Sequence, residues 1–167
     1  MKSFEELEQE IYAYVASTGI FVKGDQKLGR MRKLMDFLGN PQEKIKVMHI
    51  AGTSGKTSTS YYTAALLHAA GKKVGLTVSP HVVDVRERAQ IGMKVLEKDV
   101  WAEKMGEYFE LVKGGGQKPS YMEFFMGFAF WLAEKESVDY MVVEVGLGGL
   151  YDATNVVLRA DKVSLLY

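Results

Sequence analysis

The sequence has no cysteine and no net charge across its 167 residues. Without cysteine the chain forms no disulfide framework, no cysteine-ligated zinc site and no thiol nucleophile. The 21 Lys and Arg residues balance 21 Asp and Glu residues, so no overall basic field favours binding to nucleic acid. The sequence also lacks an export signal and any uninterrupted apolar run of about 18 residues, the length of a membrane span. We therefore expect a cytoplasmic protein with no nucleic-acid or membrane partner.

What the chain does have is the pattern of an α/β domain. Hydrophobic residues make up 47% of the sequence, and the length suits about one domain with a substantial core. Apolar runs with β-branched residues predict strands over 45–51, 73–78, 140–145 and 163–166. Amphipathic or capped segments predict helices over 3–18, 27–38, 57–70, 98–112 and 120–136. This alternation predicts an α/β fold with a mostly parallel sheet and helices on both faces.

Local signals mark where several of these elements begin and end. Ser3 with Glu6, and Ser120 with Glu123, form capping boxes that predict two helix N-termini. The sequence Gly39-Asn40-Pro41 predicts the end of the second helix. Residues 79–97 are expected to form a loop with a short hairpin.

The strongest chemical signal is a glycine-containing loop between an expected strand and an expected helix. Glycine lets the backbone curl so that N–H groups point at phosphate oxygens, and the helix N-terminus adds partial positive charge. Lys56 is expected to reach the β- and γ-phosphates, and Thr57 has the hydroxyl position that meets Mg²⁺. Together with the alternating elements, this loop predicts a P-loop NTPase-like fold. The alternative is an ordinary strand–helix turn that carries a lysine. The segment comprises Gly52, Thr53, Ser54, Gly55, Lys56, Thr57 and Ser58.

A second signal is an acidic residue at the end of a buried strand. Residues 141–143 are apolar and lead directly to Glu144, which the glycine-rich residues 146–149 follow. Ligands of open α/β sheets lie just outside the carboxyl ends of the strands, and hard cations prefer oxygen ligands. We expect Glu144 to hold Mg²⁺ against nucleotide phosphates; the alternative is a solvated glutamate that ends a strand. Asp152 follows on the same loop.

Other polar residues carry weaker signals. His49 lies inside an apolar strand and is interpreted as a core histidine, and His68 as a surface residue of a helix. His81 follows a strand end and therefore points toward the expected site. The run 86–88 is interpreted as a solvated charge run, with the alternative that Arg88 binds an anionic substrate. The aromatic residues of 124–131 are expected to be core rather than a ligand-binding box.

Four segments, in this order and spacing, together resemble a known family. They are residues 38–42 (LGNPQ), residues 49–56 (HIAGTSGK), residues 79–91 with SPH and ERAQI, and residues 144–155 (EVGLGGLYDATN). On these segments the chain resembles folylpolyglutamate synthase and dihydrofolate synthase of the Mur ligase superfamily. The resemblance covers about residues 20 to 160.

The resemblance implies ATP-dependent ligation of glutamate to a folate or dihydropteroate carboxylate through an acyl phosphate, with ATP and Mg²⁺ as cofactors. It implies catalytic roles for Lys56 and Glu144, and contacts of residues 52–58 with ATP. It further implies Mg²⁺ ligation by Thr57, Ser79 and Glu144. The residues implied to border the acid substrate are His81, Arg88, Glu123 and Asp152.

The sequence also departs from the folate enzymes. Ser54 and Thr57 stand where those enzymes usually have Asn and Gly, and the GKT form resembles the peptidoglycan Mur ligases. Two alternatives therefore stay open: another Mur-superfamily ligase that acts on a different acid, and a non-catalytic nucleotide-binding module. Only 51 residues precede Gly52, whereas peptidoglycan ligases generally carry a whole sugar-nucleotide-binding domain there.

The end of the sequence bears on domain organisation. Residues 165–167 stop inside an apolar run, so we expect the chain to be the front part of a longer protein. Under the resemblance, residues 1–167 are the N-terminal part of the ATP-binding domain, and the C-terminal amino-acid-binding domain is absent. We expect the full-length protein to be a monomer and the isolated chain to be inactive as a ligase.

Overall fold

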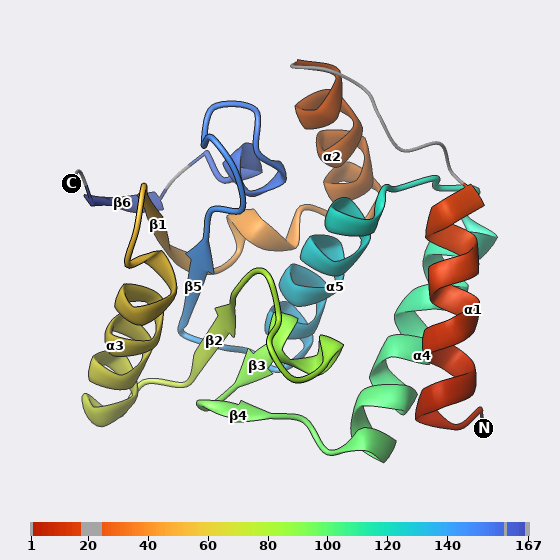
Figure 1. The fold of residues 1–167 in the computed structure, drawn as a ribbon, viewed down its shortest axis with the longest axis horizontal. Coiled ribbons are helices and arrows are strands. Elements are labelled where there is room, and N and C mark those ends of the chain that lie inside the picture. Colours follow the sequence, from red (N-terminus) through yellow and green to blue (C-terminus); the bar gives the residue numbers. More distant parts are fainter. Residues whose placement is uncertain (1, 18–24, 159, 166–167) are drawn as a thin grey trace.

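The computed structural model describes residues 2–17, 25–158 and 160–165, in which a six-stranded sheet is packed among five α-helices (Figure 1). The helices are α1 (Phe4–Ser17), α2 (Asp25–Phe37), α3 (Lys56–Ala69), α4 (Lys98–Gly114) and α5 (Tyr121–Lys135). Short 3₁₀ helices are η1 (Pro41–Glu43), η2 (Val85–Arg88) and η3 (Ala153–Val156). The strands are β1 (Lys46–Gly52), β2 (Val74–Thr77), β3 (Gln90–Ile91), β4 (Lys94–Val95), β5 (Tyr140–Glu144) and β6 (Ala160–Leu165).

The sheet is mostly parallel, as the sequence predicts. Its strand order is β4-β3-β2-β5-β1-β6. The strands β2, β5, β1 and β6 run parallel, and the hairpin of β3 and β4 adds an antiparallel edge within residues 79–97. Because β5 lies between β1 and β2, the carboxyl ends of these three strands meet at one edge of the sheet. Residues 18 and 166, the predicted ends of two elements, lie outside the described residues.

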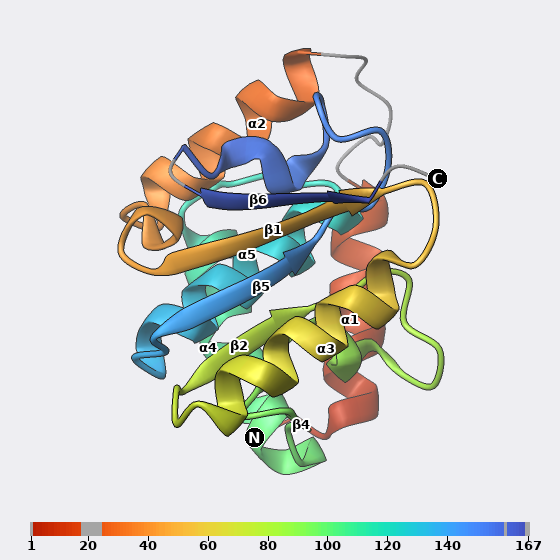
Figure 2. The same ribbon diagram turned by 90° about the vertical axis from the view of Figure 1, so that its left-hand side faces the viewer.

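Helices cover both faces of the sheet, but unevenly. Figure 2 shows α3 on the near face, and α5 with α1 and α4 on the other. The α3 face holds a small apolar cluster, with Ile50, Leu76 and Val142 from the sheet and Ala64 from the helix. The opposite face holds the main hydrophobic core, which joins α1, α2, α4 and α5 to the sheet.

The main core is built around α5. Every residue from Glu123 to Ala133 is buried, so the aromatic side chains of this helix are core, as predicted. Tyr108 of α4 packs on Phe124 and Phe128, and its hydroxyl donates a 3.0 Å hydrogen bond to the Phe124 carbonyl. Gly127 makes room for this ring, because a Cβ there would lie 2.3 Å from the Tyr108 hydroxyl.

The predicted start of α1 and end of α2 are confirmed by hydrogen bonds and backbone angles, whereas α2 begins two residues earlier than predicted and α4 ends two residues later. At the start of α1, the Ser3 amide donates to Glu6 at 2.9 Å and the Glu6 amide donates to the Ser3 hydroxyl at 3.2 Å. After α2, Gly39 and Asn40 adopt φ values of 80° and 55°, a left-handed conformation that a helix cannot continue. Within the described residues, none of the helices has the length and apolarity needed to cross a bilayer.

Candidate functional site

The glycine-containing loop lies between β1 and α3, the context that the sequence predicts. Gly55 caps the helix with φ 73°, which a residue with a side chain adopts at a cost, and α3 begins at Lys56. The first backbone hydrogen bond of the helix runs from the Thr59 amide to the Gly55 carbonyl at 2.9 Å. The amides of residues 56–58 precede that bond, so helix geometry leaves them directed out of the N-terminus, where an anion is stabilised.

Glu144 joins this loop to the neighbouring strand. Its side chain is 2% exposed at the end of β5, directly beside Ile50 of β1 in the sheet. One carboxylate oxygen accepts the Thr57 hydroxyl at 2.8 Å, and the other accepts the Ser79 amide at 3.1 Å. The structure therefore brings together the three residues that the resemblance assigns to Mg²⁺.

These residues offer a suitable but incomplete set of metal ligands. Within the described residues, no group of three or more His, Asp or Glu side chains is placed to hold a metal ion. The Glu144 carboxylate and the Thr57 hydroxyl that contacts it are hard oxygen donors, and Ser79, which meets Glu144 through its amide, carries a further hydroxyl. Such donors suit Mg²⁺, an ion that proteins often hold through one or two carboxylates and substrate phosphates. The chemistry of Glu144, Thr57 and Ser79 therefore fits a magnesium ion.

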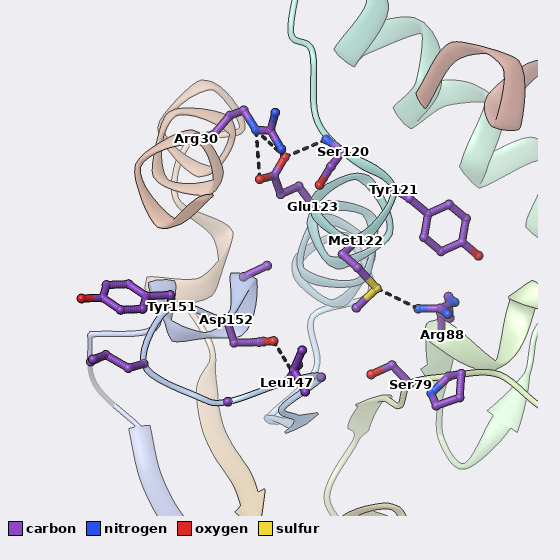
Figure 3. A pocket seen from close by; sticks show the side chains of 15 residues that line it. Arg30, Ser79, Arg88, Ser120, Tyr121, Met122, Glu123, Leu147, Tyr151 and Asp152 are labelled. Atoms are coloured by element: carbon purple, nitrogen blue, oxygen red, sulfur yellow. Dashed lines mark hydrogen bonds and ion pairs between the residues drawn. The ribbon is translucent and has the colours of Figure 1, made fainter. Parts of the chain in front are cut away.

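A cavity of about 710 Å³ lies next to this junction. Figure 3 shows that its walls come from the start of α5, from α2, and from the loops after β2 and β5. Four of the predicted site residues line it, namely Ser79, Arg88, Glu123 and Asp152. The phosphate loop lies outside the lining, and so does His81. Ser79 therefore belongs both to the cavity and to the contacts of Glu144.

Arg88 contributes a buried positive charge to the cavity. Arg88 is 8% exposed, and its guanidinium carbon lies 5.0 Å from the centre of the Tyr121 ring. Its Nε donates to Nδ1 of His81 at 3.0 Å, so His81 contacts the cavity through Arg88. Its Nη1 contacts Sδ of Met122 at 3.5 Å, and none of the ion pairs in the part of the chain that the structure describes includes Arg88. A buried guanidinium without a carboxylate partner favours an anionic ligand.

The prediction that residues 86–88 form a solvated charge run is wrong. The 3₁₀ helix η2 turns each of these side chains toward a partner. Arg86 pairs with Asp84 at 2.6 Å, and this hydrogen bond lowers the pKa of Asp84. Glu87 accepts the amides of residues 82–84 at 2.7–3.2 Å. Burial raises the pKa of Glu87, but these three amides together with the nearby His81 lower it by more, and the net shift is downward.

Glu123 is held by a residue that the sequence analysis missed. Its buried carboxylate lies 2.9 Å from Nε of Arg30 on α2, and it also accepts the Ser120 amide at 2.7 Å. Figure 3 shows this pair on the cavity wall. The two partners are 93 positions apart, and nothing in the spacing around Arg30 distinguishes it from other charged residues of an amphipathic helix.

Asp152 organises the loop that follows β5. One carboxylate oxygen accepts the Leu147 amide at 2.9 Å, and the other accepts the amide and the hydroxyl of Thr154 at 3.0 and 2.6 Å. The Thr154 hydroxyl also lies 2.9 Å from Nε2 of His49. His49 is buried, as predicted for a core histidine, and His68 is exposed, as predicted for a surface residue.

The fold and this site together define a class of protein. A parallel strand ends in a glycine-containing loop, a helix begins at its lysine, and a carboxylate ends the adjacent strand. These are the parts of a P-loop type nucleotide-binding domain, in which the helix N-terminus receives the phosphates.

Comparison with known proteins specifies the relatives. No family model matches the chain. The dihydrofolate synthase/folylpolyglutamate synthase of Bacillus subtilis is 36% identical over 135 residues, which are 78% of this chain and 31% of that protein. The structure of Mycobacterium tuberculosis folylpolyglutamate synthase complexed with ADP has a TM-score of 0.79 at 31% identity, and covers 92% of this chain and 35% of that chain. That of E. coli FolC in complex with DHPP and ADP has a TM-score of 0.80 at 29% identity, and covers 99% of this chain and 38% of that chain.

The chain is therefore homologous to part of the folylpolyglutamate and dihydrofolate synthases, as the four sequence segments indicate. It spans about a third of the length of these relatives.

Proposed function

We propose that this chain supplies the ATP site and the acid site of a ligase that joins L-glutamate to a folate or dihydropteroate carboxylate. The observation that carries the proposal is the contact of Glu144 with both Thr57 and Ser79. Thr57 belongs to the phosphate loop and Ser79 to the cavity, so one carboxylate lies between a site suited to phosphates and a site suited to an acid. Transfer of a phosphoryl group to a carboxylate requires this adjacency.

The reaction proposed has two steps. A carboxylate oxygen of the folate-like acid attacks the γ-phosphorus of ATP, the bond to the β-phosphate oxygen breaks, and ADP leaves. The amine of glutamate then attacks the carbonyl carbon of the acyl phosphate, inorganic phosphate leaves, and the amine loses a proton. Two anionic groups meet in the first step, and negative charge collects on the carbonyl oxygen and the departing phosphate in the second, so positive charge at the reacting groups lowers both barriers.

The chain offers that positive charge in two places. Lys56 and the amides at the N-terminus of α3 would bind the phosphates, and Arg88, which lines the cavity, would bind the acid. Mg²⁺, held by Glu144 with Thr57 and Ser79, would supply Lewis-acid neutralisation of the phosphate oxygens. His81 holds Nε of Arg88, while Asp152 and the Arg30–Glu123 pair shape the cavity around the substrate.

Binding measurements on the 167-residue chain test the proposal. We expect calorimetry to detect binding of a non-hydrolysable ATP analogue with Mg²⁺, and of dihydropteroate. Lys56→Ala should weaken nucleotide binding about tenfold to 100-fold, the effect of one charge-assisted hydrogen bond, and should leave the acid affinity unchanged. Arg88→Met should weaken acid binding by a similar factor and should leave the nucleotide affinity unchanged.

A matched control is Lys72→Ala, since Lys72 is exposed at the opposite end of α3 from the phosphate loop. It should change neither affinity. If the chain binds a different acid and does not bind dihydropteroate, the result would favour another Mur-superfamily ligase. Nucleotide binding with no response to any acid, or unchanged in Lys56→Ala, would overturn the ligase proposal in favour of a non-catalytic module.

A further inference from the structure

His49 is a buried polar side chain to which the proposed function assigns no role. It is 5% exposed in β1, between the apolar neighbours Met48 and Ile50. An imidazole in such a position costs free energy unless its nitrogens find partners. An apolar residue would fill this strand position without that cost. The hydrogen bond between Nε2 of His49 and the Thr154 hydroxyl is therefore the feature that a histidine adds at this position.

The direction of the hydrogen bonds follows from the chemistry of the partner. The Thr154 hydroxyl has a single hydrogen, and its oxygen lies 2.6 Å from a carboxylate oxygen of Asp152. An ionised carboxylate only accepts, so the hydroxyl hydrogen points to Asp152. The 2.9 Å contact with His49 then requires that Nε2 of the imidazole carries the proton and donates to Thr154.

The chain of hydrogen bonds thus runs from His49 through Thr154 to Asp152, and it ends at the loop after β5. The second oxygen of Asp152 accepts the Leu147 amide at 2.9 Å, which closes this loop on itself. The loop has little packing of its own, since the Leu147 and Leu150 side chains are exposed. Its position therefore depends on polar contacts, and Asp152 makes three of them.

We propose that His49 is a positioning residue for the acid site, and that it acts through Thr154 to orient Asp152 and the cavity wall at 146–152. The identity of the ligand as an acid rests on the proposed function; the effect on the loop does not. Because β1 also ends in the phosphate loop, one strand carries the phosphate site at its end and supports the acid site through a side chain.

Two pairs of variants separate this role from simple packing. His49→Phe keeps a planar ring of similar volume and removes the donor, whereas His49→Gln keeps an amide donor on a side chain of similar reach. Thr154→Val removes the hydroxyl, and Thr154→Ser retains it. Nitrogen-15 NMR of the wild-type chain should show the His49 imidazole protonated at Nε2.

Two readouts follow for each variant: hydrogen exchange of the Leu147 amide, and the affinities for dihydropteroate and for the Mg²⁺-bound ATP analogue. We expect His49→Phe and Thr154→Val to speed Leu147 exchange and to weaken acid binding about tenfold, with nucleotide affinity unchanged. His49→Gln and Thr154→Ser should retain most of the protection of the Leu147 amide and most of the acid affinity. The double variant with Phe and Val should lose no more than the worse single variant, since both remove the same link.

Additive losses, or equal losses for Phe and Gln, would overturn the proposal and leave His49 as a packing residue. A loss of nucleotide and acid affinity together would likewise contradict it. If the wild-type chain binds no acid, the proposed function fails, but Leu147 exchange still tests the role of His49.

Discussion

The pair of Arg30 and Glu123 allows a stability prediction with a defined magnitude. Arg30→Met removes the guanidinium and keeps much of the apolar stem, so it leaves a Glu123 carboxylate that is 3% exposed with only the Ser120 amide as a partner. Loss of one member of a fully buried pair costs about 3–5 kcal/mol. Arg30 is 24% exposed and the Ser120 hydrogen bond remains, so we expect about 2–3 kcal/mol. For a chain of this size that loss lowers Tm by about 4–12 °C.

Thermal and urea unfolding at neutral pH, followed by circular dichroism, measure this loss. Arg32→Met is the matched control, because Arg32 is exposed on the same helix and should be nearly neutral. The double variant Arg30→Met with Glu123→Gln should recover most of the stability, because no uncompensated charge stays buried. A cost below about 0.5 kcal/mol for Arg30→Met, or a double variant as unstable as the sum of its parts, would refute the reasoning.

Three further changes have expected outcomes. Gly127→Ala should destabilise the chain by about 1–3 kcal/mol in urea unfolding, because its Cβ would lie 2.3 Å from a tyrosine hydroxyl of α4. Gly146→Ala should weaken dihydropteroate binding about tenfold and leave nucleotide affinity unchanged, since its Cβ would lie 3.1 Å from a carboxylate oxygen of the cavity wall. The hydrogen bond from Arg86 lowers the pKa of Asp84 below 3.8, so the stability it contributes is present above that pH and lost as pH falls through the folded value. Asp84→Asn should therefore unfold with a shallower pH dependence below about pH 4, and an unchanged slope would contradict this assignment.

The parts of the site that the sequence predicts are those set by local rules. The phosphate loop follows from glycine spacing between a strand and a helix. The meeting of Glu144 with Thr57 follows from the parallel sheet, because strand ends that share a direction gather at one edge. The helix boundaries at Ser3 and Gly39 follow from capping chemistry and from the left-handed conformation.

The parts that the sequence does not predict depend on how distant segments pack. Arg30 reaches Glu123 across 93 positions, and His49 reaches Thr154 across 105. Neither contact follows from the periodicity of a helix or a strand, because each depends on how a loop or a helix packs against the sheet. The burial of Arg88 does not follow from the sequence for the same reason. A run of charges predicts exposed side chains, but α5 covers Arg88 with Tyr121.

The uneven covering of the sheet has a consequence for how the protein responds to proteolysis. On the face covered by α3, a small apolar cluster holds the helix, and Tyr62 and Leu66 on its outer surface are exposed. Elements with few buried contacts open locally at a lower free energy than the rest of a domain. A ligand that binds only the closed form raises that opening free energy in proportion to the logarithm of its concentration. If a nucleotide binds at the N-terminus of α3 as proposed, it should therefore protect this thinly packed side of the molecule from cleavage more than it protects the aromatic core on the other side.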